Sequence, residues 1–195
     1  MKKIAVFASG FGSNFEVIAA ATESGQIEAE IALLVTDHAD CYAVERAHNH
    51  HVDVFAFNPK SYSSKAAFET EIVAQLHQRG VELIVLAGYM RLIGEVLLNA
   101  YPNRIINIHP ALLPNYGGKG MYGERVHEAV IANHESKSGI TIHFVDEHYD
   151  RGTTIFQATC DVTPDDTPDT LAQKIHKLEH AHFPVVIEKV VLGQM

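Results

Sequence analysis

Short apolar runs alternate with amphipathic segments along the first hundred residues. Four of these runs predict strands, at residues 4–8, 31–35, 52–57 and 83–87. Between them, apolar positions recur at helical spacing, which predicts helices at 14–24, 42–48 and 64–79. Ser64 is expected to be the N-cap of the third helix and Gly80 to end it. Strands joined by helices form right-handed crossover units, so this part of the chain predicts a parallel sheet.

In the second half of the chain, strands no longer alternate regularly with helices. The run IINI predicts a strand at 105–108, followed by a glycine-rich loop at 110–123 and a helix at 124–133. Two further strands are expected at 140–145 and 154–162, with only a loop between them. That loop is too short for a helical crossover, so the two strands are predicted to be antiparallel and the sheet to be mixed.

A last amphipathic segment predicts a helix with Thr167 as N-cap and Pro168 at its first position. Pro184 lies within this segment and is expected to kink or interrupt the helix. The chain has no repeats, low-complexity tracts or linkers. The pattern therefore predicts a single α/β domain over residues 1–195, with a mostly parallel, twisted, mixed sheet and helices on both faces.

The composition narrows the classes of function. Of 195 residues, 47% are apolar and 20% are charged, and the formal net charge is −9. A broad nucleic-acid surface is not expected, because phosphate binding needs clustered Lys and Arg. No membrane helix is expected either, since no stretch reaches about 20 apolar residues. Cys41 and Cys160 lie far apart in the chain and predict free thiols, so we expect a cytoplasmic protein.

The segment ASGFGSN, residues 8–14, separates the first strand from the first helix. Glycines at a helix N-terminus allow a phosphate to approach the backbone N–H groups. The segment is similar to the dinucleotide fingerprint GxGxxG, but Phe15 occupies the third glycine position and weakens a nicotinamide interpretation. Asp37, near the position of a ribose-binding acid, keeps that interpretation open. The alternatives are a single-phosphate site and an ordinary turn capped by Ser13 or Asn14.

Asn107 and His109 lie two residues apart at the end of a strand, so both side chains are expected on the same side of it. An amide N–H₂ can donate to a developing oxyanion, and an imidazole can transfer a proton near neutral pH. Pro110 favours an extended conformation for His109 and helps to fix its direction. Taken alone, the pair is more typical of a hydrogen-bonded strand end than of a catalytic site.

Two further groups of polar residues are candidates for a functional site. The turn at 146–150 is rich in carboxylates, and one of them is predicted to reach His109 and stabilise its protonated form. The alternative is a solvated acidic loop. His176 and His180 lie four residues apart on the last helix, but neither a following Glu nor a third ligand is indicated. We therefore expect no metal site.

Five stretches together resemble the folate-dependent formyltransferases. They are SGFGSN (9–14), VLAGYMRLI (85–93), INIHPALLP (106–114), GITIHFVDEHYDRG (139–152) and LEHAHFP (178–184), in family order over nearly the whole chain. The GSN loop, residues 12–14, resembles the corresponding loop in the branch of the family that acts on glycinamide ribonucleotide. The resemblance implies a Rossmann-like formyltransferase fold with a phosphate-binding half at about 1–100 and a catalytic and folate half at about 101–195. It also implies transfer of a formyl group from 10-formyltetrahydrofolate to the amine of glycinamide ribonucleotide in purine biosynthesis.

The resemblance further implies roles for individual residues. The matching catalytic residues are Asn107, His109 and Asp150, with protonated His109 and Asn107 stabilising an oxyanion. The matching acceptor-binding residues are Gly12, Ser13, Asn14 and Glu179. The matching folate-binding residues are Lys65, Met90, Arg91, Leu92, Ile93, Asn107, Asp146, Glu147, His148, Tyr149 and Asp150. In the family the bond that matches Leu113–Pro114 can be cis. The loop at 115–130 and Arg151 depart from the usual family pattern.

The expected partners are the two small-molecule substrates, with 10-formyltetrahydrofolate as cosubstrate. Neither a metal nor a nicotinamide cofactor is expected, and neither a nucleic acid nor a membrane is an expected partner. The protein is expected to be a monomer or a weak homodimer. The alternative functions are another folate-dependent formyl transfer or hydrolysis, and a nucleotide-sensing module without chemistry. Substrate-dependent turnover separates the enzymes from the sensing module.

Overall fold

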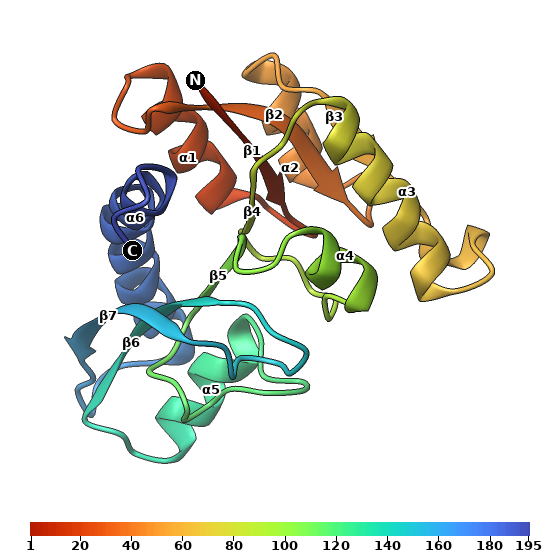
Figure 1. Ribbon diagram of the computed structural model, residues 1–195. Coiled ribbons are helices and arrows are strands. Elements are labelled where there is room, and N and C mark those ends of the chain that lie inside the picture. Colours follow the sequence, from red (N-terminus) through yellow and green to blue (C-terminus); the bar gives the residue numbers. More distant parts are fainter.

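The computed structural model describes all 195 residues of the chain. It contains a seven-stranded sheet in the order β3-β2-β1-β4-β5-β6-β7. Helices α1 and α6 lie on one side of this sheet and α3 and α4 on the other (Figure 1). The predicted single-domain α/β fold with a mostly parallel, mixed sheet is confirmed. No helix is both long enough and apolar enough to cross a membrane.

The elements follow the predicted order, with one addition. The strands are β1 (Lys2–Phe7), β2 (Ala29–Thr36), β3 (Val54–Ala56), β4 (Leu83–Leu86), β5 (Ile105–His109), β6 (Lys137–Phe144) and β7 (Thr154–Asp161). The helices are α1 (Ser13–Glu23), α2 (Tyr42–Asn49), α3 (Lys65–Gln78), α4 (Glu95–Ala100), α5 (Glu124–Ala132) and α6 (Pro168–Val191), with a 3₁₀ turn at Pro59–Ser61. Helix α4 was not predicted.

Strand pairing creates a switch point in the middle of the sheet. Strands β1 to β5 are parallel, and β6 pairs with β5 in the antiparallel direction. Strands β6 and β7 are also antiparallel to each other, as their short connection predicted. The chain runs outward from β1 to β3 and then returns to β4 on the other side of β1. Loops that follow β1 and β4 therefore diverge and leave a crevice at the carboxyl ends of these strands.

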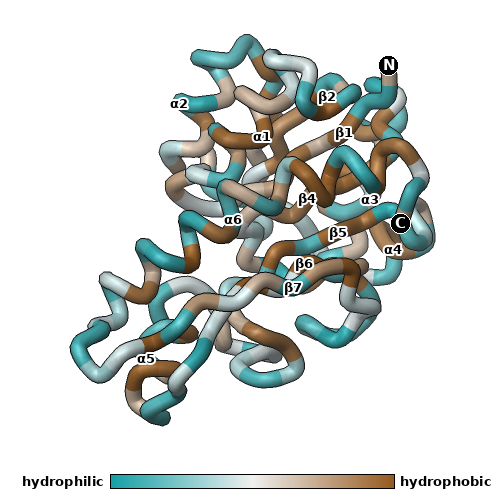
Figure 2. The backbone as a smooth tube through the Cα atoms, turned by 90° about the vertical axis from the view of Figure 1, so that its left-hand side faces the viewer, coloured by the Kyte–Doolittle hydropathy of each residue, from teal (hydrophilic) through white to brown (hydrophobic).

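The alternation of side chains along β1 divides the core into two layers. Ile4 and Val6 pack into a cluster with α1, α2 and α6, whereas Ala5 and Phe7 pack with α3 and α4. Both sets are fully buried, which explains why β1 is a continuous apolar run rather than an alternating one. Figure 2 shows this hydrophobic character on β1 and β4, which are neighbouring strands in the interior of the sheet.

Two helix N-termini carry the predicted caps. The side chain of Ser64 accepts a hydrogen bond from the N–H of Ala67, and the side chain of Thr167 accepts one from Thr170. Helix α6 continues through Pro184 to Val191, so of the two expected effects, a kink or an interruption, the interruption does not occur. The Pro184 ring is buried against the core, and this packing offsets the missing backbone hydrogen bond.

Helix α4 depends on a carboxylate from another helix. Its N-cap is Gly94, which has no side chain to offer, and the buried carboxylate of Glu69 on α3 accepts the Gly94 N–H at 2.7 Å. Burial raises the pKa of Glu69, and the nearby backbone N–H groups and Lys65, 3.8 Å away, partly counter that rise. Glu69, a residue of another helix, therefore provides the N-terminal cap that the residues at the start of α4 do not provide.

Replacing Glu69 with Ala is expected to lower the free energy of unfolding by about 1–2 kcal/mol, the usual range for losing a helix cap. Gln retains one acceptor oxygen, so Glu69→Gln should lose less. Urea unfolding of both variants measures the difference. Equal stability of Glu69→Ala and the wild type would contradict the capping role.

Candidate active site

The carboxyl ends of β1, β4 and β5 surround a cavity of about 270 Å³. The loop after β1 and the turn after β4 form two of its walls, and the end of β5 and the loop at 110–123 form others. Helices α5 and α6 contribute one or two side chains each. The lining residues are Gly10, Phe11, Gly12, Ser13, Asn14, Ala87, Gly88, Tyr89, Met90, Asn107, Ile108, His109, Pro110, Gly118, Gly120, Met121, Tyr122, Gly123, His127, Tyr149, Asp150, His176 and Glu179.

The loop after β1 directs its backbone N–H groups away from other protein acceptors. All three carbonyls of residues 10–12 are engaged: they accept from the N–H of Ala43, from Nε of Arg46 and from the N–H of Glu16. The N–H groups of residues 12–14 donate to no backbone carbonyl. Gly12 has a left-handed φ of 73° at this point, and the loop opens α1. Free N–H groups at a helix N-terminus form a binding site for an anion.

Gly12 is also required by close packing. A Cβ at this position would lie 2.8 Å from Cβ of Ala43 and 2.9 Å from its Cα. Helix α2 therefore supports the loop from behind at a distance that excludes every side chain. The guanidinium of Arg46 lies over the exposed ring of Phe11, 4.7 Å from its centroid.

Asn14 and Glu179 connect α1 to α6 across the cavity wall. The amide nitrogen of Asn14 donates to the Glu179 carboxylate at 3.1 Å, and the amide oxygen of Asn14 is buried without a partner. Burial raises the pKa of Glu179 to about 7, against the smaller opposing effect of the Asn14 hydrogen bond. The site thus holds a buried carboxyl group that changes charge near neutral pH and an unused acceptor beside it.

The end of β5 brings the predicted catalytic residues together. Both Asn107 and His109 line the cavity, and Nδ1 of His109 lies 3.6 Å from Oδ1 of Asp150. The Nε2 atom of His109 is 2.8 Å from the carbonyl of Tyr116, to which it donates as an N–H. Gly118 N–H donates to the other Asp150 oxygen at 2.9 Å. The acidic turn and the glycine-rich loop therefore meet at His109.

Burial and the neighbouring groups act in opposite directions on the pKa of His109. As predicted, Asp150 reaches His109 and stabilises its protonated form, and the Tyr116 carbonyl acts in the same direction. Burial has the larger effect, so the pKa of His109 lies below its ordinary value. For Asp150, burial raises the pKa, but His143, His109 and the Gly118 N–H together bring it below its ordinary value. Asp150 is a carboxylate at neutral pH.

Sequence reasoning missed His143. It lies on β6 opposite Asn107 and is 1% exposed. The Asn107 amide nitrogen is 3.1 Å from Nε2 of His143, whose Nδ1 is 2.8 Å from the carbonyl of Phe144. With Nδ1 donating to that carbonyl, Nε2 accepts from Asn107 and fixes the direction of the amide. The available signal was the alternation of Thr141 and His143 with apolar residues in a buried strand.

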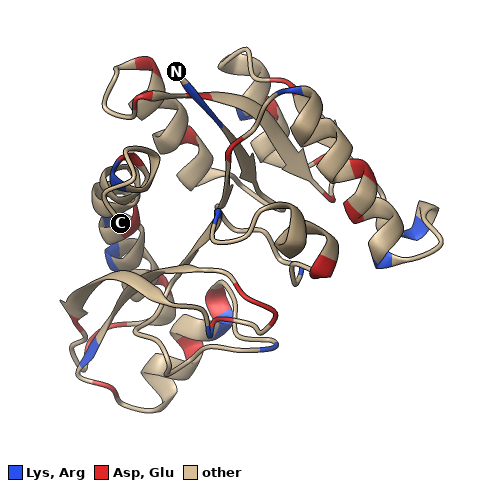
Figure 3. Ribbon diagram, in the orientation of Figure 1, with Lys and Arg blue, Asp and Glu red and all other residues tan.

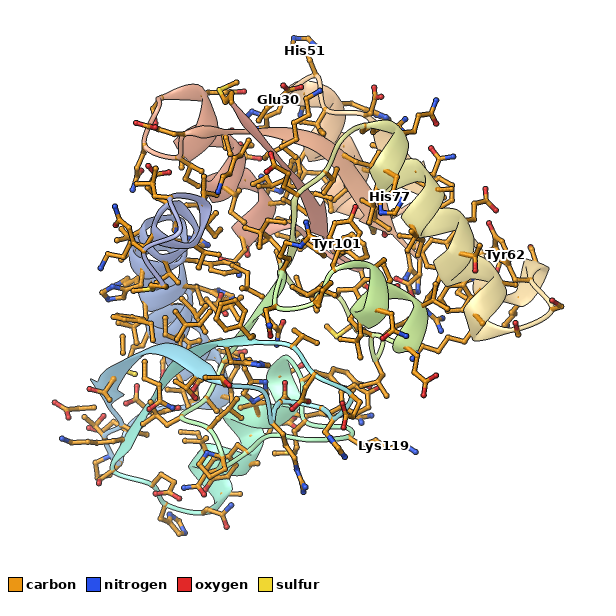
Figure 4. All side chains as sticks on the ribbon, in the orientation of Figure 1. Glu30, His51, Tyr62, His77, Tyr101 and Lys119 are labelled. Carbon is orange, nitrogen blue, oxygen red and sulfur yellow. The ribbon has the colours of Figure 1, made fainter.

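The loop at 110–123 closes the cavity without adding a cation to it. The Leu113–Pro114 peptide bond is cis. Lys119 in this loop is exposed and points into solvent (Figure 4). No Lys or Arg lines the cavity, and Figure 3 shows these residues spread over several elements instead. A bound anion therefore depends on backbone N–H groups and on helix α1.

Of the residues predicted on the folate side, the structure brings some to the cavity and not others. Met90, Asn107, Tyr149 and Asp150 line it. Ile93 is buried in the core, Arg91 is ion-paired with Asp37, and exposed Lys65 lies beside Glu69. Leu92, Asp146, Glu147 and His148 are also absent from the lining.

Two other predictions concern residues outside the catalytic group. The rings of His176 and His180 stack with centroids 6.2 Å apart, and no group of three or more His, Cys, Asp or Glu side chains is arranged to hold a metal ion. The carboxylate of Asp37 accepts hydrogen bonds from Ser9 and Arg91 and is buried. Both of its oxygens thus contact protein side chains, and Asp37 does not line the cavity, so its position gives no support to the ribose-binding role.

The chain matches the formyl transferase family over residues 2–187. It is 49% identical over 191 residues to the phosphoribosylglycinamide formyltransferase of Bacillus subtilis (strain 168), with 98% of this chain and 95% of that protein covered. The crystal structure of phosphoribosylglycinamide formyltransferase from Bacillus halodurans has a TM-score of 0.92 at 43% identity, covering 97% of this chain and 95% of that one. Glycinamide ribonucleotide transformylase 1 from Symbiobacterium toebii has a TM-score of 0.93 at 37% identity, covering 99% and 89%.

Proposed function

The chain belongs to the formyl transferase family, and on that basis we propose that the cavity holds a formyl acceptor and a formyl donor on two sides of Asn107 and His109. The protein is a formyltransferase of purine biosynthesis. It transfers the formyl group of 10-formyltetrahydrofolate to the primary amine of glycinamide ribonucleotide. The products are formylglycinamide ribonucleotide and tetrahydrofolate.

The acceptor phosphate binds the loop at 12–14 in this proposal. The free N–H groups of this loop and the positive end of α1 supply the attraction that the absent Lys and Arg do not. Glu179 and the unpaired oxygen of Asn14 are placed to accept hydrogen bonds from the rest of the ribonucleotide. The amine is then directed towards the end of β5.

The chemistry takes place beside Asn107 and His109. The uncharged amine attacks the formyl carbon, and the carbonyl oxygen becomes an oxyanion. Asn107 donates one amide N–H to His143, so its second N–H remains for the oxyanion. A positioned donor of this kind contributes about 3–4 kcal/mol to the transition state. The reaction needs no covalent enzyme intermediate.

Proton transfer completes the reaction. After attack, the acceptor nitrogen carries one proton too many, and the leaving folate nitrogen needs one. Asp150 and His109 form a carboxylate–imidazole pair 3.6 Å apart that can receive the first proton and return one. Burial lowers the pKa of His109, which favours the neutral imidazole that can accept that proton. The pair returns to its starting state after each turnover.

One observation carries this proposal: an anion-binding loop and an amide–imidazole–carboxylate group line the same cavity. The test follows the absorbance change on conversion of 10-formyltetrahydrofolate to tetrahydrofolate, with and without glycinamide ribonucleotide. We expect turnover that saturates with both substrates and depends on the acceptor. Consumption of the donor at an equal rate without the acceptor would indicate hydrolysis and overturn the proposal.

Replacing Arg46 with Gln is expected to raise the KM for the acceptor about tenfold, the effect of losing a charge-assisted hydrogen bond. The Arg46 Nε–Phe11 carbonyl bond keeps that carbonyl turned away from the cavity. The turnover number should change by no more than about twofold, because Arg46 touches no reacting group. Steady-state kinetics on both substrates measures the two constants.

Arg79→Gln is the matched control. Arg79 pairs with Asp53 at 3.3 Å and does not line the cavity, so its loss should leave both constants unchanged. An unchanged acceptor KM in Arg46→Gln would show that the loop keeps its conformation without the Arg46–Phe11 hydrogen bond.

A further inference from the structure

Asp37 lies at the end of β2 and carries a buried carboxylate that no step of the proposed reaction uses. Its side chain is 2% exposed. Oδ1 accepts the Ser9 hydroxyl at 2.6 Å and lies 3.0 Å from Nδ1 of His38, and Oδ2 accepts Nε of Arg91 at 2.7 Å. Three side chains from the loops after β1, β2 and β4 thus converge on one carboxylate. A buried charge with this many donors is a built arrangement rather than a chance surface contact.

Ser9 links Asp37 to the turn after β4, which forms one wall of the cavity. Its backbone N–H donates to the carbonyl of Gly88 at 3.0 Å, and its hydroxyl oxygen accepts the N–H of Met90 at 3.1 Å. A serine hydroxyl has one proton, and a carboxylate can only accept. Because Asp37 is charged, the Ser9 hydroxyl donates its hydrogen bond to Asp37. A lone pair of the Ser9 oxygen then remains to accept the Met90 N–H.

Arg91 provides the second link. It follows Met90 in the turn after β4, and its side chain donates to the other Asp37 oxygen. Asp37 therefore holds Arg91 directly and Met90 through Ser9. Gly88, Tyr89 and Met90 line the cavity, whereas Asp37 does not. The influence of Asp37 on bound substrate is consequently indirect.

We propose that Asp37 is a positioning residue for the formyl donor: through Ser9 and Arg91 it fixes the turn at 88–91 that forms the donor side of the cavity. This rests on the proposed function and on the family resemblance, which implies that Met90, a residue lining the cavity, contacts the folate. The acceptor loop has a separate support, because Ala43 and Arg46 hold residues 10 and 11 from α2. The effect of Asp37 is therefore confined to the donor side.

The protonation state of Asp37 agrees with this role. Burial raises the pKa of Asp37, and the hydrogen bonds from Ser9, His38 and Arg91 outweigh that effect and bring it below its ordinary value. The group remains a carboxylate through the neutral pH range. The hydroxyl of Ser9 accordingly keeps one orientation.

The test compares Asp37→Asn, Ser9→Ala and the double variant in steady-state kinetics on both substrates. Asn preserves the shape of Asp37 but lets its NH₂ donate to Ser9, which reverses the direction of that hydrogen bond. We expect each single variant to raise the donor KM about tenfold, with acceptor KM and turnover number within about twofold. The double variant should resemble the single ones, because both changes break the same chain of contacts.

Asp166→Asn is the control for loss of a carboxylate that is paired with a basic side chain. Asp166 has a 7% exposed side chain that pairs with Lys174 near the start of α6, remote from the cavity. We expect this variant to lose thermal stability and retain all kinetic constants. If Asp37→Asn behaves like Asp166→Asn, Asp37 is a structural residue and the proposal is wrong. Additive effects of Asp37→Asn and Ser9→Ala would also contradict it.

The wild-type enzyme in the same series separates this proposal from the proposed function. Absence of acceptor-dependent turnover in the wild type would overturn both. Normal wild-type turnover with an unchanged donor KM in Asp37→Asn would overturn the positioning role alone.

Discussion

Asp150→Asn is expected to lower the turnover number by about 10²- to 10⁴-fold, the usual contribution of a positioned acid or base. The substitution removes the negative charge beside Nδ1 of His109 and the ability to accept a proton. The backbone should tolerate it, because Asp150 has a left-handed φ of 55° and Asn adopts that conformation readily. The Asn oxygen also keeps the hydrogen bond from the Gly118 N–H.

Two measurements check this result. Steady-state kinetics should show the loss in the turnover number with small changes in both KM values, and circular dichroism should show an intact fold. Asp53→Asn is the control, since Asp53 pairs with Arg79 away from the cavity. Near-wild-type turnover in Asp150→Asn would remove Asp150 from the chemistry.

Glu179→Gln is expected to stabilise the protein at pH 8 and at the same time to impair the binding of the acceptor. Burial raises the pKa of Glu179 from its ordinary 4.5 to about 7, so the folded state holds this proton more tightly than the unfolded state. Ionising the carboxyl group therefore costs stability as pH rises from about 4.5 to about 7, on the order of 3 kcal/mol. Gln cannot ionise and avoids that loss.

The weaker binding of the acceptor in Glu179→Gln also follows from the loss of an ionisable carboxyl group. Above about pH 7 the Glu179 carboxylate is a strong acceptor for hydrogen bonds from the ribonucleotide. Gln is weaker, so we expect the acceptor KM to rise about tenfold. In the wild type that KM should increase as pH falls through about 7, and in Glu179→Gln it should not.

Urea unfolding at several pH values and steady-state kinetics measure the two effects. Glu188→Gln on the same helix is the charge control, since it does not line the cavity. It should leave the kinetic constants unchanged. A Glu179→Gln variant that is less stable than the wild type at pH 8 would contradict the inferred cost of burying the carboxylate.

The sheet was predictable because its central strands are buried on both faces. The run LIVL in β4 has no polar residue, and such a run is typical of a parallel sheet. Helix α4 was not predictable in the same way. It has six residues and a glycine N-cap, and Glu69, the carboxylate that caps it, precedes it on another helix. A pattern of neighbours in the sequence cannot report a hydrogen bond of this kind.

The proposed catalytic residues were predictable as residues, but the effect of burial on the pKa of His109 was not. Asn107 and His109 stand out because they are polar positions at the end of an apolar strand. The low pKa of His109 arises from burial beneath the loop that carries Tyr116, which depends on tertiary packing. His143 acts on Asn107 only through the β5–β6 register, and a shift of one residue would turn it to the other face.

The predicted folate-side residues show a further limit. The stretch MRLI follows β4, yet Met90 lines the cavity while Arg91 binds Asp37 and Ile93 enters the core. The sequence places this segment beside the cavity but does not give the direction of each side chain. Asp37 was noticed as a candidate ribose ligand, and its actual contacts suggest a different use of the same carboxylate.

The central claim is that this cavity directs a formyl group to one particular amine. Its most direct measurement supplies 10-formyltetrahydrofolate with an isotopic label in the formyl carbon to an equal mixture of glycinamide ribonucleotide, its dephosphorylated form and glycinamide, in water. Mass spectrometry then identifies the labelled product. We predict that the label appears almost entirely on glycinamide ribonucleotide, matched by an equal amount of tetrahydrofolate. Label recovered as formate, or divided evenly among the acceptors, would contradict the account.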